Sequence, residues 1–163
     1  MWNPGTGQWE LGARASVYRG YHSSAMLLPN GTVLSTGGGV PGPATNFNAE
    51  VYYPPYLFTR SGSRSVLAPR PRIARIDSSQ LTYGGKLNLW LDNTAPVASI
   101  AIVGLSSNTH SFNSGQRLVP ARFAQTGNRV TMRVPASASV TPPGYYLVFA
   151  STRRVPSRGV IIA

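Results

Sequence analysis

Short apolar runs, each ended by glycine or proline, recur along this chain. Between its 17 glycines and 14 prolines lie segments rich in valine, isoleucine, leucine and tyrosine. No stretch sustains the 3.6-residue apolar period of an amphipathic helix. Short strands separated by turn residues are typical of all-β proteins. We therefore predict an all-β fold.

The clearest strand pattern lies in the second half of the chain. The segment KLNLWLD, which begins at Lys86, alternates leucines with polar or aromatic residues, as a half-buried strand does. The predicted strands of this half are Ile73–Ile76, Lys86–Leu91, Ser99–Val103, Arg129–Val134, Tyr145–Ala150 and Val160–Ala163. Strands at this spacing over residues 69–163 predict an immunoglobulin-like β-sandwich. Because the chain has no cysteine, no disulfide joins the predicted sheets.

Residues 1–58 are predicted to form about one four-stranded unit. The stretch SAMLLPNGTVLSTGG predicts a β-hairpin with arms at Ala25–Leu28 and Thr32–Ser35, and its Asn30–Gly31 pair suits a tight turn with positive φ angles. The stretch AEVYYPPYLF predicts a strand that two prolines interrupt. Such a unit has exposed edges, which a β-propeller covers with neighbouring blades. We therefore predict one blade of a partial β-propeller, and expect the chain to be the C-terminal part of a longer propeller protein.

A segment rich in serine, glycine, arginine and proline separates the two parts of the chain, roughly from Thr59 to Arg72. We place the domain boundaries at this change of composition. The predicted domains are a propeller blade at 1–58, a linker at 59–68 and an immunoglobulin-like domain at 69–163.

The charge of the chain bears on its partners. The formal net charge is +11, and arginine carries nearly all of the positive charge because Lys86 is the only lysine. Strongly basic proteins attract nucleic acids and acidic surfaces, but nucleic-acid binders tend to cluster their charge. Here the arginines are scattered, and the small groups are Arg70, Arg72 and Arg75, and Arg153, Arg154 and Arg158. A solvated basic surface is favoured over nucleic-acid binding. Binding to nucleic acid or to acidic polysaccharide stays an open hypothesis.

The sequence lacks the signals that mark several classes of protein. No apolar run approaches the roughly 20 residues needed to span a bilayer, and the N-terminal MWNPGTGQWEL lacks a signal-peptide pattern. We therefore expect no membrane segment, and either a protein that is not secreted or a chain that begins downstream of its natural start. The four acidic residues are dispersed, so a two-carboxylate glycosidase is unsupported. Neither a G-x-S-x-G nucleophile elbow nor a complete P-loop is present.

Three side chains remain as candidates for chemistry: Tyr21, His22 and His110, which include both histidines of the chain. His110 lies in the polar stretch SSNTHSFNSGQR between two predicted strands. Adjacent residues of a regular strand point to opposite faces, so Tyr21 and His22 can serve one site only if the backbone bends there. Two imidazoles and a phenolate form a donor set that suits copper(II), and zinc less specifically. A packing or hydrogen-bonding role for each histidine is the alternative.

Five blocks of sequence carry a resemblance to a known family. They are RGYHSSAMLLPNGTVLSTGGG, NFNAEVYYPPYLF, RP, THSFNSGQR and PPGYYLVFASTRRVPS, and in this order they cover nearly the whole chain. The blocks resemble the C-terminal end of the galactose oxidase/glyoxal oxidase family of copper radical oxidases. The resemblance implies that residues 1–58 are the last blade of a seven-bladed Kelch propeller and that 69–163 are the immunoglobulin-like domain that follows it. It also implies that the parent protein is secreted.

By motif, the resemblance assigns three copper ligands. Tyr21 matches the family's axial tyrosine and proposed general base, His22 matches one equatorial histidine, and His110 matches the histidine that the second domain delivers. The implied reaction is two-electron oxidation of a primary alcohol, aldehyde or carbohydrate substrate, with O2 reduced to hydrogen peroxide. Tyr21 would accept the substrate's hydroxyl proton, and copper would act as a Lewis acid. The missing upstream blades would complete the protein.

Two features depart from the family's pattern. The family's radical cofactor, a tyrosine cross-linked to a cysteine, lies upstream and cannot form in this chain, which has no cysteine. The small disulfide of galactose oxidase after the glycine run is also absent from VPGPATNFN. We therefore expect an active parent oxidase and an inactive isolated chain.

The alternative function is a non-catalytic Kelch/immunoglobulin-like module, either structural or carbohydrate-binding. In that case exposed tyrosines could stack on sugars, although packing between the blade and the sandwich is the favoured interpretation. These tyrosines are Tyr52, Tyr53, Tyr56, Tyr145 and Tyr146.

Overall fold

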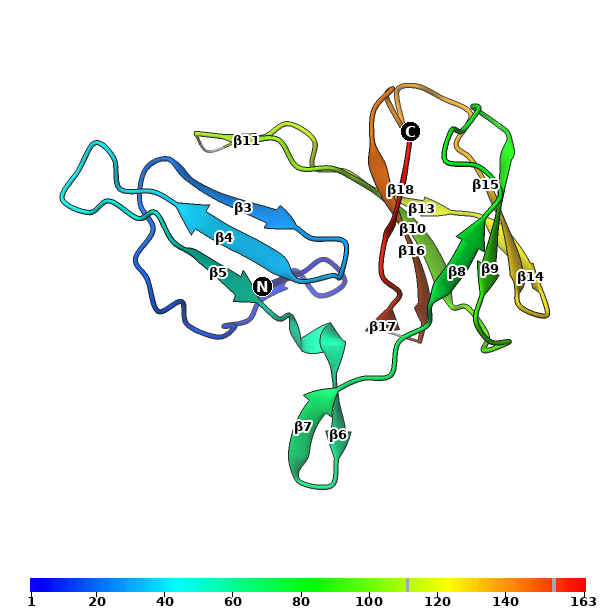
Figure 1. Ribbon diagram of the computed structural model, residues 1–163, viewed down its shortest axis with the longest axis horizontal. Coiled ribbons are helices and arrows are strands. Elements are labelled where there is room, and N and C mark those ends of the chain that lie inside the picture. The colour runs from blue at the N-terminus through cyan, green and yellow to red at the C-terminus, as the bar shows by residue number, and fades with distance from the viewer. Residues whose placement is uncertain (111, 154) are drawn as a thin grey trace.

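The computed structural model describes residues 1–110, 112–153 and 155–163, which form short antiparallel strands (Figure 1). Ser111 of the predicted histidine loop and Arg154 of the second arginine group lie outside the described residues. Within those ranges the one helical element is the 3-10 turn η1 (Pro55–Leu57). No helix among them has the length and apolar character needed to cross a membrane. The prediction of an all-β fold is confirmed.

Two antiparallel sheets pack face to face in the second half of the chain, which confirms the predicted sandwich (Figure 1). One sheet has the strand order β14-β15-β9-β8. Its strands are β14 (Phe123–Thr126), β15 (Arg129–Arg133), β9 (Lys86–Leu91) and β8 (Ile73–Ile76). The other sheet has the strand order β13-β10-β16-β17, and β18 also pairs with β16. Its strands are β13 (Leu118–Ala121), β10 (Ser99–Gly104), β16 (Tyr146–Thr152), β17 (Val155–Pro156) and β18 (Val160–Ile162). All six predicted strands are present, with small differences at their ends.

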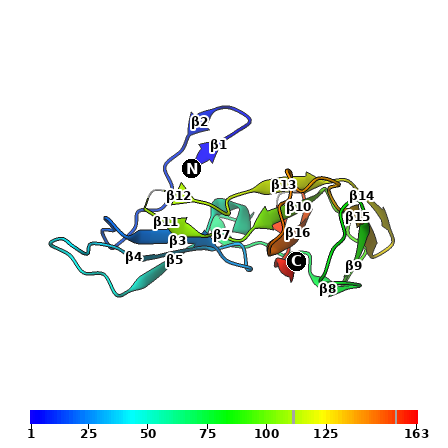
Figure 2. The same cartoon turned by 90° about the horizontal axis from the view of Figure 1, so that it is seen from above.

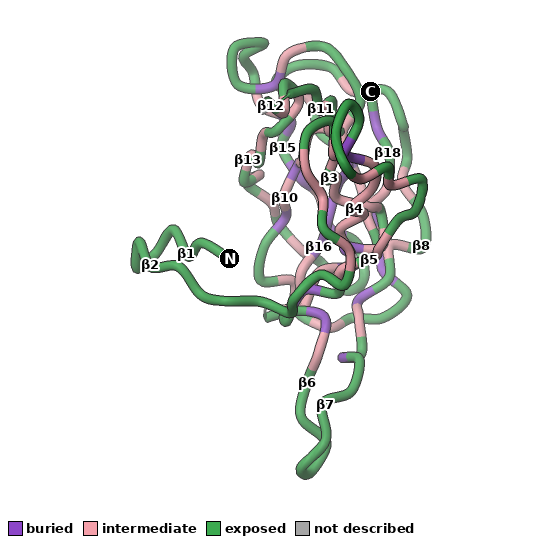
Figure 3. Tube along the Cα trace, turned by 90° about the vertical axis from the view of Figure 1, so that its left-hand side faces the viewer, coloured by how far each residue is buried: buried purple, intermediate pink, exposed green. Residues whose placement is uncertain are grey.

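The hydrophobic core lies between these two sheets. The leucines of the KLNLWLD segment are at most 1% exposed, so the alternation correctly identified the face that packs inward. Figure 3 shows that buried residues concentrate in the sandwich, while the hairpins at the chain's periphery are exposed. The core residues are Leu87, Leu89, Leu91, Ile100, Ile102, Val130, Met132, Val134, Val148, Ala150 and Ile162.

The sequence did not predict strands β13 and β14, which lie at the edges of the two sheets. Both are four residues long and only partly buried, so apolar alternation hardly marks them. Pro120 lies within β13, and proline is tolerated in a sheet mainly on edge strands, where its missing N–H removes no ladder hydrogen bond.

The N-terminal part holds a three-stranded antiparallel sheet instead of the expected four-stranded unit. Its strands, in the order β3-β4-β5, are β3 (Ser23–Leu27), β4 (Val33–Gly37) and β5 (Ala49–Tyr52). The hairpin of β1 (Trp2–Asn3) and β2 (Gln8–Trp9) forms a separate two-stranded sheet, and it projects away from the rest in Figure 2. The two tryptophans of the WNPGTGQW stretch pair across this small hairpin.

The β3–β4 hairpin contains the predicted turn residues in a loop longer than two residues. The N–H of Gly31 donates to the carbonyl of Leu28 (2.8 Å), and Gly31 has a φ of +78°. The Asn30 side chain accepts hydrogen bonds from the N–H and the hydroxyl of Thr32, at 3.1 and 2.6 Å. Only Gly31 therefore needs the left-handed conformation, while Asn30 stabilises the turn through its side chain.

Most of the predicted linker at 59–68 forms a hairpin. Strands β6 (Phe58–Ser61) and β7 (Arg64–Leu67) pair with each other and extend away from both larger sheets (Figures 1 and 3). Almost all of the residues in this hairpin are exposed. Serine and glycine content correctly indicated an exposed segment, but it did not reveal the pairing.

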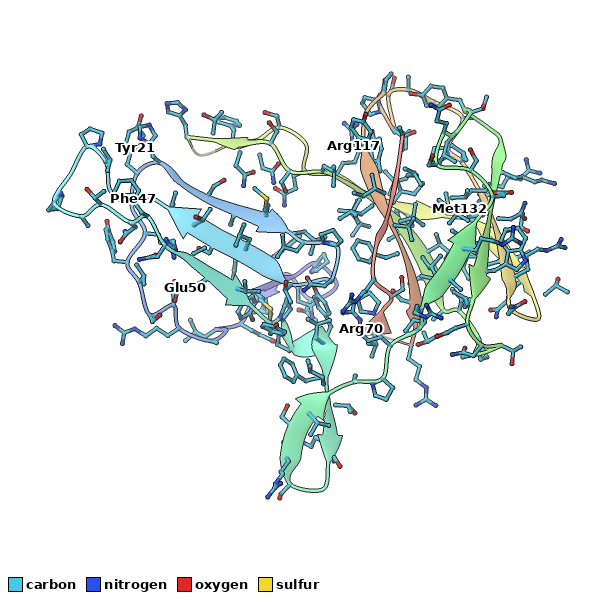
Figure 4. All side chains as sticks on the ribbon, viewed as in Figure 1. Tyr21, Phe47, Glu50, Arg70, Arg117 and Met132 are labelled. Atoms are coloured by element: carbon cyan, nitrogen blue, oxygen red, sulfur yellow. The ribbon has the colours of Figure 1, made fainter. Side chains whose placement is uncertain are left out.

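Arg70 joins the β3–β4 turn to the sandwich, and Figure 4 shows its position between the two parts. Its guanidinium donates to the carbonyls of Asn30, Pro156 and Ser157 at 2.5, 2.8 and 2.7 Å. The N–H of Gly159 adds a bond to the carbonyl of Pro29 at 2.7 Å. The guanidinium therefore connects the N-terminal hairpin to the end of β17, the strand paired with β16.

Replacing Arg70 by alanine should lower the free energy of unfolding by about 2–4 kcal/mol, because three carbonyls lose a charged donor. The neighbouring Arg72 is the matched control, since its side chain is 68% exposed and its one ion pair among the described residues is with Asp92. Arg72→Ala should change stability by at most about 1 kcal/mol. Urea unfolding of both variants measures the difference. Equal losses in the two variants would show that Arg70 has no special role at the junction.

Candidate metal centre

Tyr21, His22 and His110, far apart in the sequence, come together at one place in the fold. The ring centroids of Tyr21 and His22 are 3.8 Å apart, and those of Tyr21 and His110 are 5.8 Å apart. The two imidazole centroids are separated by 6.0 Å. Figure 4 shows Tyr21 at the outer end of the N-terminal sheet, beside the arm that contains β11 (Asn108–Thr109). All three predicted site residues therefore face a common space.

A bend in the backbone allows two neighbouring side chains to face the same space. The N–H of Ser23 donates to the carbonyl of Gly20 (3.1 Å), which closes a turn around Tyr21 and His22. His22 has a φ of +67°, in the left-handed region that a non-glycine residue seldom adopts. This conformation costs roughly 1–2 kcal/mol, and it brings the His22 ring beside the Tyr21 ring.

The glycine run after β4 makes room for this turn. Gly38 has a φ of +98°, and a Cβ atom there would lie 3.1 Å from the carbonyl oxygen and 3.2 Å from the nitrogen of Gly20. The N–H of Gly39 donates to the carbonyl of Tyr21 at 2.7 Å. The run is therefore packed directly against the backbone that presents Tyr21 and His22.

The His22 ring is oriented by its own hydrogen bond. Its Nδ1 lies 2.7 Å from the carbonyl oxygen of Val40. A carbonyl can only accept, so Nδ1 carries the proton and Nε2 keeps a free lone pair. A backbone carbonyl on one ring nitrogen is a common arrangement for a histidine that binds a metal through the other.

His110 is carried by an arm that leaves the sandwich after β10. The arm contains β11 (Asn108–Thr109) and β12 (Phe112–Asn113), which pair with each other. The Asn108 side-chain amide donates to the carbonyl of Ala25 in β3, so the arm is attached to the N-terminal sheet. His110 also has a positive φ, +55°. Its Nδ1 lies 2.9 Å from the Thr109 hydroxyl, which can accept the Nδ1 proton and so leave Nε2 free to bind a metal.

A second network, which sequence reasoning missed, holds the segment before Tyr21. The Arg19 guanidinium donates to the carbonyl of Gly37 (3.0 Å) and the side chain of Asn48 (2.9 Å), and it pairs with Glu50 at 3.4 Å. Glu50 also accepts from the N–H and the hydroxyl of Ser16. The hydrogen bonds from Ser16, with the charge of Arg19, lower the pKa of Glu50 below its usual value of 4.5. Nothing in the linear sequence marks these residues as partners.

The donor set of this site suits copper(II). Within the described ranges, no three His, Cys, Asp or Glu side chains gather, so the third donor beside the two imidazoles is the Tyr21 phenol. A metal bound at about 2.0 Å from a ring nitrogen lies about 3 Å from that ring's centroid, so one ion can bridge rings 6.0 Å apart. Two nitrogens and one oxygen fit a tetragonal copper(II) ion. All three side chains are exposed, which leaves the site open to further ligands.

The five tyrosines considered for sugar stacking do not form one surface. Tyr56 and Tyr146 donate their hydroxyls to the carbonyls of Gly31 and Pro142, which indicates structural roles. Tyr53 and Tyr145 are 48% and 65% exposed, but they lie in the N-terminal part and in the sandwich, respectively. Tyr52 is partly buried in β5.

Comparison with known proteins gives consistent results. Residues 70–163 match the family described as galactose oxidase-like, early set domain. A galactose oxidase from Gibberella zeae is 35% identical over 146 residues, covering 87% of this chain and 21% of that protein. An aldehyde oxidase, GLOX, from Vitis pseudoreticulata is 32% identical over 159 residues, covering 87% of this chain and 29% of its own length. The chain thus spans less than a third of the length of each of these relatives.

A solved structure is similar over almost the whole chain. A fungal alcohol oxidase of the AA5 family, determined in complex with copper, superposes with a TM-score of 0.89 at 28% identity. The match covers 99% of this chain and 34% of that protein. The N-terminal sheet, the arm and the sandwich therefore have counterparts in one larger oxidase chain.

Gly38→Ala should lower the affinity for copper(II) by about ten-fold or more, because the new Cβ pushes on Gly20 and displaces Tyr21 and His22. Gly62→Ala is the matched control: Gly62 also has a positive φ, +61°, but a Cβ atom there would meet nothing within 4 Å. It carries the backbone strain without the contact. Calorimetric titration with copper(II) compares the two variants. Unchanged affinity in Gly38→Ala would contradict this role of the glycine run.

Glu50 should contribute to stability at neutral pH and lose that contribution in acid. Its pKa is lower in the folded chain than in the unfolded chain, so its contribution is complete above about pH 4.5 and disappears as the pH falls through the folded-state pKa. Glu50→Gln keeps an acceptor for Ser16 but cannot titrate. Urea unfolding between about pH 3 and about pH 7 should show a weaker acid dependence in the variant. Identical profiles would rule out this contribution.

Proposed function

This chain belongs to the galactose oxidase/glyoxal oxidase family of copper radical oxidases, and we propose that it is the C-terminal part of such an oxidase, in which Tyr21, His22 and His110 bind copper. The parent enzyme would oxidise a primary alcohol, aldehyde or carbohydrate and reduce O2 to hydrogen peroxide. Residues 1–58 would be its last Kelch blade, 59–68 the connection, and 69–163 the immunoglobulin-like domain.

The observation that carries this proposal is the convergence of the three side chains from two separate parts of the fold. Ring centroids 3.8–6.0 Å apart bring together two nitrogens and one oxygen. Both histidines have positive φ angles, and such strained conformations persist where the surrounding structure holds them, commonly at functional sites. A purely structural histidine on a loop needs no such strain.

Each residue has a distinct part in the proposed reaction. When bound, copper supplies a Lewis acid and one of the two electron acceptors that the oxidation of an alcohol requires. His22 and His110 would hold the ion through Nε2. The Nδ1 proton of His22 is donated to the carbonyl of Val40, and the hydroxyl of Thr109 can accept the Nδ1 proton of His110. Tyr21 would accept the proton of the substrate's hydroxyl group as a general base.

The remaining chemistry belongs to the rest of the parent protein. A second one-electron centre, a tyrosine cross-linked to a cysteine, would come from upstream residues, since this chain has no cysteine. The missing blades would also cover the edges of the N-terminal sheet and form much of the substrate pocket. Like the family to which it belongs, the parent protein would act outside the cell.

Copper titration tests the proposed site. The wild-type chain should bind one copper(II) ion with nitrogen hyperfine structure from two imidazoles in its electron paramagnetic resonance spectrum. Loss of a residue that only supports a metal ligand typically lowers metal affinity by about 10–100-fold. Removal of a ligand itself should cost at least as much, so His22→Ala and His110→Ala should each lower the affinity for copper(II) by about 100-fold. Tyr21→Phe should change the spectrum, whereas Tyr145→Phe, a control at an exposed tyrosine of the sandwich, should not. Equal binding in wild type and both histidine variants would favour the non-catalytic module.

The isolated chain should produce no hydrogen peroxide from galactose or glyoxal, even when loaded with copper. It lacks the second one-electron centre, so a two-electron oxidation cannot be completed. A coupled peroxidase assay on the purified 163-residue chain measures this directly. Sustained peroxide formation that depends on the substrate would show that the chain needs no upstream radical site.

A further inference from the structure

One face of the sandwich gathers basic residues that are scattered in the sequence. In the sheet β14-β15-β9-β8, the leucines of β9 point into the core, so Lys86, Asn88 and Trp90 point outward. Residues directly opposite each other on neighbouring strands share a face. Arg129 pairs with Trp90, and Arg133 pairs with Lys86.

The outward residues form two basic rows with a polar row between them. Arg75, Trp90 and Arg129 form one row across three strands, and Lys86 and Arg133 form the other. Arg129 and Arg133 are four residues apart on β15, so the rows lie about 13 Å apart. We call Arg75, Lys86, Arg129 and Arg133 the basic face.

The four cations of the basic face have no anionic partner among the described residues. Ion pairs in those ranges join Arg19 to Glu50 and Arg72 to Asp92. The carboxylate of Asp77 lies beside the middle row and accepts two hydrogen bonds from Asn88. Asp77 offsets one of the four charges, and the exposed Arg122, whose carbonyl accepts from the N–H of Arg133, adds another.

The stacking of Arg75 on Trp90 determines what this face can bind. The Arg75 guanidinium carbon lies 3.5 Å from the centroid of the Trp90 ring. A stacked guanidinium is held flat while its N–H donors, which lie in its plane, stay available to carboxylate or sulfate oxygens. The same stacking covers one face of the Trp90 ring. Bases of a single-stranded nucleic acid need free rings for stacking, so this face favours a polymer recognised by its charge.

The basic face is also separate from the candidate copper site. Figures 1 and 2 show the sheet β14-β15-β9-β8 on the side of the sandwich turned away from the N-terminal sheet and from the arm that carries β11. A partner on this face would not cover Tyr21, His22 or His110.

We propose that the basic face binds an acidic polysaccharide, a polymer with carboxylate or sulfate groups, and so attaches the protein to that polymer. The two rows of cations match a flat, repeating array of anions. The binding does not depend on copper or on turnover.

Affinity for defined polymers tests the proposal. The wild-type chain should bind polygalacturonate or heparin, which carry carboxylates and mainly sulfates, respectively, and it should not bind neutral dextran. The affinity should fall steeply between about 50 mM and about 200 mM salt, because bound cations are released. The double variant Arg129→Gln/Arg133→Gln should bind about ten-fold more weakly, with a smaller salt dependence. The tighter of the two acidic polymers identifies the anion.

A matched double variant, Arg60→Gln/Arg64→Gln, removes the same charge from the exposed β6–β7 hairpin. It should keep the wild-type affinity within about two-fold, which would exclude a simple effect of net charge. Equal losses in the two double variants would overturn the proposal, as would the absence of binding to both acidic polymers. Tighter binding of single- or double-stranded DNA than of either polysaccharide would overturn it in favour of a nucleic-acid interface.

Discussion

The candidate copper site depends on the attachment of the sandwich to the N-terminal sheet. Tyr21 and His22 belong to one part and His110 to the other, so the distances from the His110 ring to the other two rings are set by the junction between the parts. Arg70 fixes that junction at one end with three hydrogen bonds to carbonyls, and Asn108 fixes the arm to β3 at the other. A small rotation about this junction would move His110 by several ångströms while leaving both sheets intact.

Strain at the site is balanced by contacts that surround it. His22 and His110 both adopt the left-handed conformation, at a combined cost of roughly 2–4 kcal/mol. Around His22, the glycine run and the carbonyl of Val40 hold the turn in place. The buried guanidinium of Arg19, paired with Glu50, holds the segment that leads into this turn. The strained turn is thus held by groups from several strands.

Much of the fold follows from period-two alternation, and the parts that were not predicted lack it. KLNLWLD identified β9 and its inward face because three leucines alternate without interruption. Strands β13 and β14 are short, partly polar edge strands, and the β6–β7 hairpin is exposed on both sides, so burial leaves no pattern there. The site residues could be named from two histidines and a Tyr-His pair. Their supports, Arg19, Glu50 and Asn108, could not, because each acts across a long separation in sequence.

The same alternation that builds the core also gathers the surface charge. Each inward leucine of β9 requires an outward neighbour. Pairing with β15 and β8 places Arg129 and Arg75 on either side of Trp90, and Arg133 beside Lys86. Arg75 and Arg129, more than fifty residues apart in the chain, thus lie on either side of Trp90, two strand spacings or about 10 Å apart. A charge pattern that looks dispersed along the sequence can therefore form a compact basic surface, and its character has to be judged from strand register and not from linear clustering.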